Sequence, residues 1–126
     1  MDGLHLTADL RGCASPQLAM TEPAALRDVC LAAVGAAGLS PVGELFHRFP
    51  PPGGITGVVL LAESHVAVHT WPEMNAVTLD VYVCNFGGDN SARAETLLAA
   101  LIDAFAPRRI ERHALHRGTA VSGPSA

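Results

Sequence analysis

Three short apolar stretches follow one another closely in the middle of this 126-residue chain, and their spacing limits the folds that it can adopt. They run from Ile55 to Glu63, from Val66 to Trp71 and from Val77 to Cys84, with only Ser64-His65 between the first two. A parallel pair of strands needs a long crossover, so this short connection predicts an antiparallel hairpin. We expect the third stretch to be another strand.

The remaining sequence predicts two helices and three further strands. We expect strands at Leu4–Leu10, Pro41–Phe49 and Ile110–Leu115. One helix is expected to be capped by Thr21 and to stop at Gly35 or Gly38, and a second follows the apolar stripe from Ala94 to Phe105 and ends before Pro107. Two helices among six strands indicate an α+β fold, a two-layer sandwich with a mainly antiparallel sheet and both helices on one face.

Alternation within the middle strands divides the sheet into two faces. Val77, Leu79, Val81 and Val83 share one side, while the opposite side carries Thr78, Asp80, Tyr82 and Cys84. In the preceding strand His69 and Trp71 lie opposite to the valines. If the valines face the helices, then the uncovered face holds His69, Trp71, Tyr82 and Cys84, which makes it a candidate surface for a ligand or a second subunit.

Composition narrows the function classes. The net charge is −4 and lysine is absent, which argues against a nucleic-acid surface and favours a small neutral or cationic ligand. Three widely spaced cysteines indicate free thiols in a reducing compartment, so we expect a cytoplasmic location, and no apolar run is long enough for a membrane helix. We expect one domain over residues 1–118 and a flexible tail over 119–126.

The segment "AESHVAVHTWPE", Ala62 to Glu73, concentrates chemical groups. His65 and His69 have the i, i+4 spacing of a zinc pair, but that spacing aligns ligands on a helix and this segment is predicted to be a strand, so we expect no metal. A hydrolase using Ser64 or Cys84 with His69 is conceivable, yet no G-x-S-x-G elbow accompanies them.

The stretch "FHRFPPPGGITGVVLLAESHVAVHTWPE", followed by "LDVYVC", resembles the small prokaryotic S-adenosylmethionine decarboxylases, which are pyruvoyl enzymes. The specific part is ESH-x-x-x-HTWPE with a cysteine eleven residues beyond the glutamate. The resemblance runs from about His5 to Gly118. It implies a proenzyme that cuts itself between Glu63 and Ser64 into residues 1–63 and 64–126.

The resemblance also implies roles for single residues. Ser64 would attack the Glu63 carbonyl, pass through an ester and dehydroalanine, and become the covalent pyruvoyl cofactor. His69 would serve processing, a role that suits an imidazole, with support from the Thr56 hydroxyl. In the mature enzyme the pyruvoyl group would form a Schiff base with the substrate amine, and Cys84 would donate the proton that replaces carbon dioxide.

The implied substrate is S-adenosylmethionine, decarboxylated for spermidine and other polyamines. Phe49, Trp71 and Glu73 are the nearest candidates for binding its sulfonium, adenine and ribose, although Glu73 could equally be a turn residue and Trp71 an interface residue. The implied assembly is a dimer of processed protomers with active sites near the interface. A straight strand would separate Ser64 from His69 by roughly 16 Å, so we expect either that the hairpin tip folds back or that the two residues meet across a dimer interface.

The chain departs from the family pattern at Ala62, at Thr56, in the Pro-Gly loop and at Met74-Asn75, where an aromatic-glycine pair is usual. The last change keeps open a pyruvoyl-dependent decarboxylase of a basic amino acid such as arginine or ornithine. A third hypothesis is a homologue that is not processed and only binds the ligand or regulates an active partner.

Overall fold

The computed structural model describes residues 2–85 and 88–118 of the chain. Within them, six strands form one antiparallel sheet in the order β2-β3-β4-β5-β1-β6. The strands are β1 (Gly3–Arg11), β2 (Pro41–Arg48), β3 (Ile55–Leu61), β4 (Ser64–Trp71), β5 (Ala76–Cys84) and β6 (Arg109–Arg117). The helices are α1 (Pro23–Ala36), α2 (Ser91–Phe105) and two single turns, η1 (Leu18–Met20) and η2 (Pro72–Met74).

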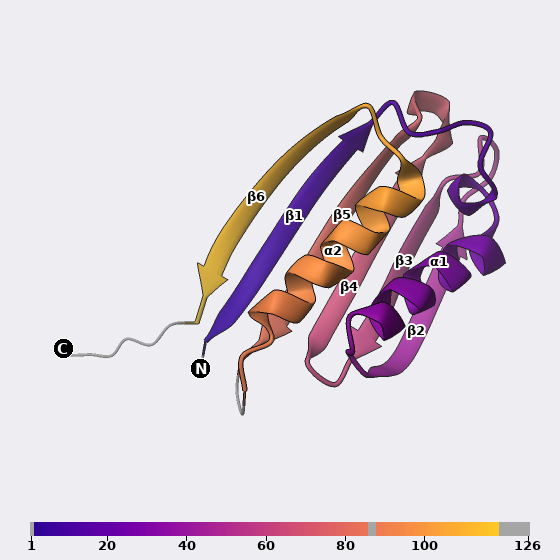
Figure 1. The fold of residues 1–126 in the computed structure, drawn as a ribbon. Helices are drawn as coiled ribbons and strands as arrows, with labels where there is room; N and C mark the ends of the chain where they lie inside the picture. The colour runs from indigo at the N-terminus through magenta and orange to yellow at the C-terminus, as the bar shows by residue number, and fades with distance from the viewer. Residues whose placement is uncertain (1, 86–87, 119–126) are drawn as a thin grey trace.

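Both long helices cover the same face of the sheet (Figure 1). Helix α2 packs on β5 and β1, and α1 packs on β2 and β3. The predicted α+β two-layer sandwich is therefore confirmed. The predicted flexible tail, residues 119–126, lies outside the described residues.

The predicted division of β5 into two faces is also confirmed. Val77, Val81 and Val83 are fully buried, and they meet the buried stripe of α2, which consists of Ala94, Leu97, Leu98, Leu101 and Phe105. The alternate residues of β5 remain half-exposed on the other face. Within residues 2–85 and 88–118 no helix covers that face, so polar side chains there keep part of their contact with water.

The hairpin between β3 and β4 turns two residues earlier than the sequence predicts. The turn consists of Ala62 and Glu63, and Ser64-His65 opens β4 instead of forming the turn. The reason is Glu63: every second residue of β3 from Ile55 to Leu61 is buried, and an extension of the strand would place the Glu63 carboxylate in that buried row. In the turn, Glu63 Oε1 instead accepts a hydrogen bond from Ser40 N at 3.1 Å.

The start of α1 differs from the prediction as well. Glu22 occupies the N-cap position and Pro23 the first turn, where proline is favoured because no hydrogen bond is lost. Thr21 donates its backbone N–H to Leu18 O and is not the cap.

The three cysteines are free thiols in the structure, as expected. Cys13 and Cys30 are buried, and burial together with the nearby Glu44 raises the pKa of Cys30 to about 12. Cys84, at the end of β5, is half-exposed. In the residues that the structure describes, no helix combines the length and the apolar character that crossing a membrane requires.

Candidate active site

The end of the β3–β4 hairpin brings Glu63, Ser64 and Cys84 together. The Ala62-Glu63 turn places Glu63 directly opposite the end of β5, so that the backbone N–H of Cys84 donates to Glu63 O at 2.9 Å. The following residue, Ser64, has a backbone φ of 157°, a positive value that residues other than glycine rarely adopt. The carbonyl of the Glu63–Ser64 peptide bond thus accepts a hydrogen bond, and Ser64 follows it with an uncommon backbone φ.

The side chain of Ser64 lies beside an imidazole. Its Oγ is 3.5 Å from Nδ1 of His65, the next residue of β4. The His65 ring in turn lies against the Tyr82 ring, with centroids 5.7 Å apart and planes inclined at 46°. A hydroxyl, an imidazole and a polarised carbonyl at one strand end can carry out acyl transfer.

The buried side-chain amide of Asn90 holds the end of β5 by a hydrogen bond. Asn90 is only 7% exposed, and its Nδ2 donates to Cys84 O at 3.0 Å. Its Oδ1 accepts from Arg93 Nη1 at 2.9 Å. Sequence reasoning missed Asn90; its position in "GGDN", directly before α2, was the available signal, since asparagine is favoured where a helix begins.

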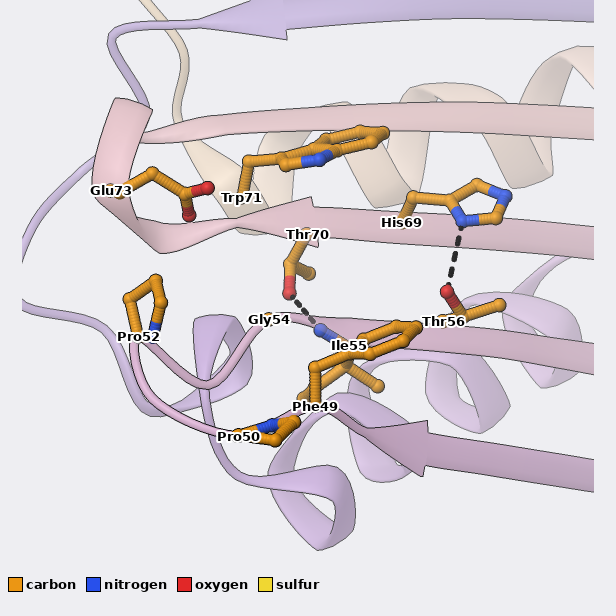
Figure 2. Close-up of a pocket in the computed structure, with 10 residues that line it drawn as sticks. All are labelled: Phe49, Pro50, Pro52, Gly54, Ile55, Thr56, His69, Thr70, Trp71 and Glu73. Atoms are coloured by element: carbon orange, nitrogen blue, oxygen red, sulfur yellow. Dashed lines mark hydrogen bonds between the residues drawn. The ribbon is translucent and has the colours of Figure 1, made fainter.

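The opposite end of β4 borders a pocket of about 360 Å³. Figure 2 shows that the side chains of β3, β4 and the proline-rich loop converge on it. Its lining consists of Phe49, Pro50, Pro52, Gly54, Ile55, Thr56, His69, Thr70, Trp71 and Glu73. The structure therefore brings five predicted site residues together here: Thr56, His69, Phe49, Trp71 and Glu73.

His69 is held in a defined orientation within this pocket. Its Nδ1 lies 3.2 Å from Thr56 Oγ1, which stands directly opposite on β3 (Figure 2). Its ring stacks on Trp71, with centroids 5.8 Å apart and planes inclined at 30°. When Thr56 donates to Nδ1, the proton of the neutral ring is on Nε2; when Thr56 accepts, Nδ1 carries it.

The pocket mouth combines aromatic surface with one carboxylate. Phe49 is 49% exposed at the end of β2, and Glu73 belongs to the short turn η2 that follows Trp71. Aromatic faces and a carboxylate suit a cationic ligand. Asn75 closes the turn in the left-handed conformation, with φ of 48°, so it reproduces the backbone that a glycine would supply.

A histidine and a carboxylate lie close together on the same face of the sheet, on β1 and β5. His5 Nε2 is 3.1 Å from Asp80 Oδ1, and the His5 ring meets the edge of Tyr82 with centroids 5.9 Å apart. The Arg117 guanidinium lies 5.7 Å from the centre of the Tyr82 ring. These groups surround Tyr82 on the uncovered face.

Ser64 and His69 do not meet within one chain. Strand β4 continues without interruption from Ser64 to Trp71, so the two residues are separated by roughly 16 Å of strand. The hairpin tip does not fold back toward the pocket. Ser64 on β4 and Cys84 on β5 thus lie near one end of β4, and the pair of Thr56 on β3 and His69 on β4 lies toward its other end. Across the described residues, no three metal-ligating side chains gather into a site.

Comparison with known proteins agrees with the resemblance seen in the sequence. The family model for S-adenosylmethionine decarboxylase matches residues 4–118. An S-adenosylmethionine decarboxylase proenzyme from Aquifex aeolicus is 40% identical over 92% of this chain and 81% of its own length, and one from Archaeoglobus fulgidus is 37% identical over 92% and 97%. The crystal structure of the adenosylmethionine decarboxylase from Aquifex aeolicus superposes with a TM-score of 0.85 at 35% identity, covering 98% of this chain and 97% of that one.

Proposed function

The chain belongs to the S-adenosylmethionine decarboxylase family, and from this premise we propose that it cuts itself between Glu63 and Ser64 and then decarboxylates S-adenosylmethionine. The observation that carries the proposal is the hairpin end. The Glu63 carbonyl accepts a hydrogen bond from Cys84 N at 2.9 Å, and the Ser64 hydroxyl follows immediately in the chain. Nucleophile and polarised carbonyl are adjacent before any cofactor exists.

The first part of the reaction is self-processing. Attack of Ser64 Oγ on the Glu63 carbonyl places negative charge on an oxygen that the Cys84 N–H already faces, and such a donor stabilises the charge. The amide is exchanged for an ester. A base then removes the Ser64 α-proton, and the ester is eliminated with Glu63 as the new carboxyl end of the first chain.

His69 is the proposed base for that second step, supplied by a second copy of the chain. His69 is too far from Ser64 of its own chain. If two chains pack through their uncovered faces about a two-fold axis perpendicular to the strands, the start of β4 in one chain faces the end of β4 in the other. Large apolar side chains exposed on this face also favour a partner: Leu45, Leu60 and Leu115.

The residues around Ser64 fit a pyruvoyl group, since its hydroxyl and the hydrogen-bonded Glu63 carbonyl are adjacent and the half-exposed Cys84 lies at the facing end of β5. That group supplies an electron-withdrawing carbonyl which accepts the electrons released with carbon dioxide. Cys84 then returns a proton to the substrate α-carbon. Its position opposite the cleavage site, with a half-exposed thiol, supports this role.

Substrate recognition is assigned to the pocket at the other end of β4. The Trp71 and Phe49 faces and the Glu73 carboxylate suit the sulfonium and the ribose hydroxyls of S-adenosylmethionine. The product is the aminopropyl donor for spermidine and polyamine synthesis. The alternative of a basic amino acid rested on Met74-Asn75; Asn75 keeps the turn, and Met74 lies outside the lining of this pocket, which weakens that alternative.

Release of labelled carbon dioxide tests the proposed substrate. Purified protein is incubated separately with carboxyl-labelled S-adenosylmethionine, arginine and ornithine, and Ser64→Ala serves as the control because it cannot form the cofactor. We expect release from S-adenosylmethionine alone and none from the variant. Release from arginine or ornithine but not from S-adenosylmethionine would overturn the substrate assignment, and the absence of any release would favour the regulatory homologue.

A further inference from the structure

Resting on the proposed self-cleavage, we propose that His65 is the catalytic base of its first step and takes the Ser64 hydroxyl proton within the same chain. His69 is then required only for the later elimination. This assigns a role to a histidine that, in the sequence, resembled only half of a metal pair.

His65 lies beside the nucleophile. Its Nδ1 is 3.5 Å from Ser64 Oγ, and distances of this kind shorten in the reacting complex. With the ring proton on Nε2, Nδ1 is free to accept.

The neighbouring strand restrains the His65 ring. His65 stands opposite Tyr82 in the β4–β5 register, and the two rings are in contact at a centroid distance of 5.7 Å. Tyr82 is packed on its other sides by His5 and by the Arg117 guanidinium. The imidazole therefore does not move freely in solvent, and its orientation toward Ser64 is supported by packing.

Two other candidate bases, Glu63 and His69, are engaged elsewhere or too distant. The Glu63 carboxylate accepts from Ser40 N, and His69 is roughly 16 Å away along the strand. The carbonyl under attack is already bonded to Cys84 N. A base and a donor for the developing oxyanion are thus both present on one chain.

The proposed step balances without any added reagent. The O–H bond of Ser64 breaks, its proton moves to His65 Nδ1, and Oγ bonds to the Glu63 carbonyl carbon. The protonated imidazole then returns the proton to the Ser64 nitrogen as the C–N bond breaks. The products are an ester and a free α-amine, and His65 regains its starting form.

Hydroxylamine separates the two steps because it cleaves an ester but not the original amide. His65→Phe keeps a ring against Tyr82 and loses the base, and His65→Asn loses the base while keeping a polar atom. His69→Asn is the comparison for the second step, and His116→Phe is the matched control, since His116 is an exposed histidine of β6 that stands opposite the buried Leu4 and so lies on the other face of the sheet from His65. Thermal unfolding establishes that each variant is folded.

We expect both His65 variants to form the ester at least about 100-fold more slowly than the unchanged protein, so that hydroxylamine releases almost no 64–126 chain from them. His69→Asn should accumulate ester, which hydroxylamine cleaves to a chain that begins with intact Ser64. His116→Phe should process normally. Normal processing of His65→Phe, or accumulation of hydroxylamine-sensitive ester in it, would overturn the assignment. Failure of the unchanged protein to cleave at all would instead overturn the proposed function.

Discussion

At the scale of residues, one carbonyl oxygen connects the two halves of the proposed chemistry. Glu63 O is bonded to the backbone N–H of Cys84, whose thiol is the proposed proton donor of the mature enzyme. The N–H group that is proposed to assist cleavage of the peptide bond and the thiol that is proposed to act later on the substrate therefore belong to the same residue, Cys84. Any shift of the end of β5 is expected to impair both processing and turnover.

The motif in the sequence was sufficient to select Ser64, His69 and Cys84 as candidates, and their roles remain proposals. It could not select His65 or Asn90. The interaction of His65 depends on where the hairpin turns, and that of Asn90 depends on a loop returning to the end of β5. A histidine next to Ser64 and an asparagine before a helix do not by themselves indicate these hydrogen-bond partners, which become evident only in the fold.

A buried hydroxyl holds the pocket end of the hairpin, and its removal should be measurable. Thr70 is 3% exposed; its Oγ1 donates to Met20 O at 2.8 Å and accepts from Ile55 N at 2.9 Å. Thr70→Val keeps the volume but leaves both partners unsatisfied, so we expect a loss of about 2 kcal/mol in the free energy of unfolding, measured by urea titration.

Thr78→Val is the matched control for this prediction. Thr78 is a half-exposed residue of β5 on the uncovered face, and the same substitution there should change the free energy of unfolding little. Equal effects of the two substitutions would contradict the assigned role of the Thr70 hydroxyl.

At the scale of elements, alternation and helical periodicity were enough to predict the strands, both long helices and the two faces of the sheet. Alternation did not determine the position of the β3–β4 turn, because two positions of the turn are compatible with the same pattern of buried residues. A turn at Ser64-His65 or at Ala62-Glu63 leaves the same valines buried, and only the cost of burying the Glu63 carboxylate, together with its bond to Ser40 N, selects the second.

This difference of two residues matters for function. A turn at Ser64-His65 would put the cleavage site at the tip of the loop, away from β5. The observed turn instead makes Ser64 the first residue of β4 and brings Glu63 opposite Cys84. Register, rather than composition, positions the reacting bond.

At the scale of the whole molecule, a straight β4 keeps His69 away from Ser64 of the same chain, so a single chain lacks a base for the elimination. We expect mixed dimers of two inactive variants to restore processing. Ser64→Ala keeps His69 and cannot cleave, whereas His69→Asn keeps Ser64 and lacks the elimination base. When the two are co-expressed with different tags, about half of the His69→Asn chains should acquire a pyruvoyl end if dimers form at random.

The His69→Asn protein expressed alone is the control, and it should produce no pyruvoyl end. If mixed dimers are isolated by their two tags and the His69→Asn chain still lacks the pyruvoyl end, then His69 does not act across the interface. The proposed arrangement of the two uncovered faces would then be wrong.

Intact-mass measurement of the purified protein tests the central proposal most directly. We predict two chains, residues 1–63 and residues 64–126, the second lighter by one ammonia than the serine-ended fragment and without a free amino terminus. A single uncut chain that retains Ser64 after prolonged incubation would contradict it.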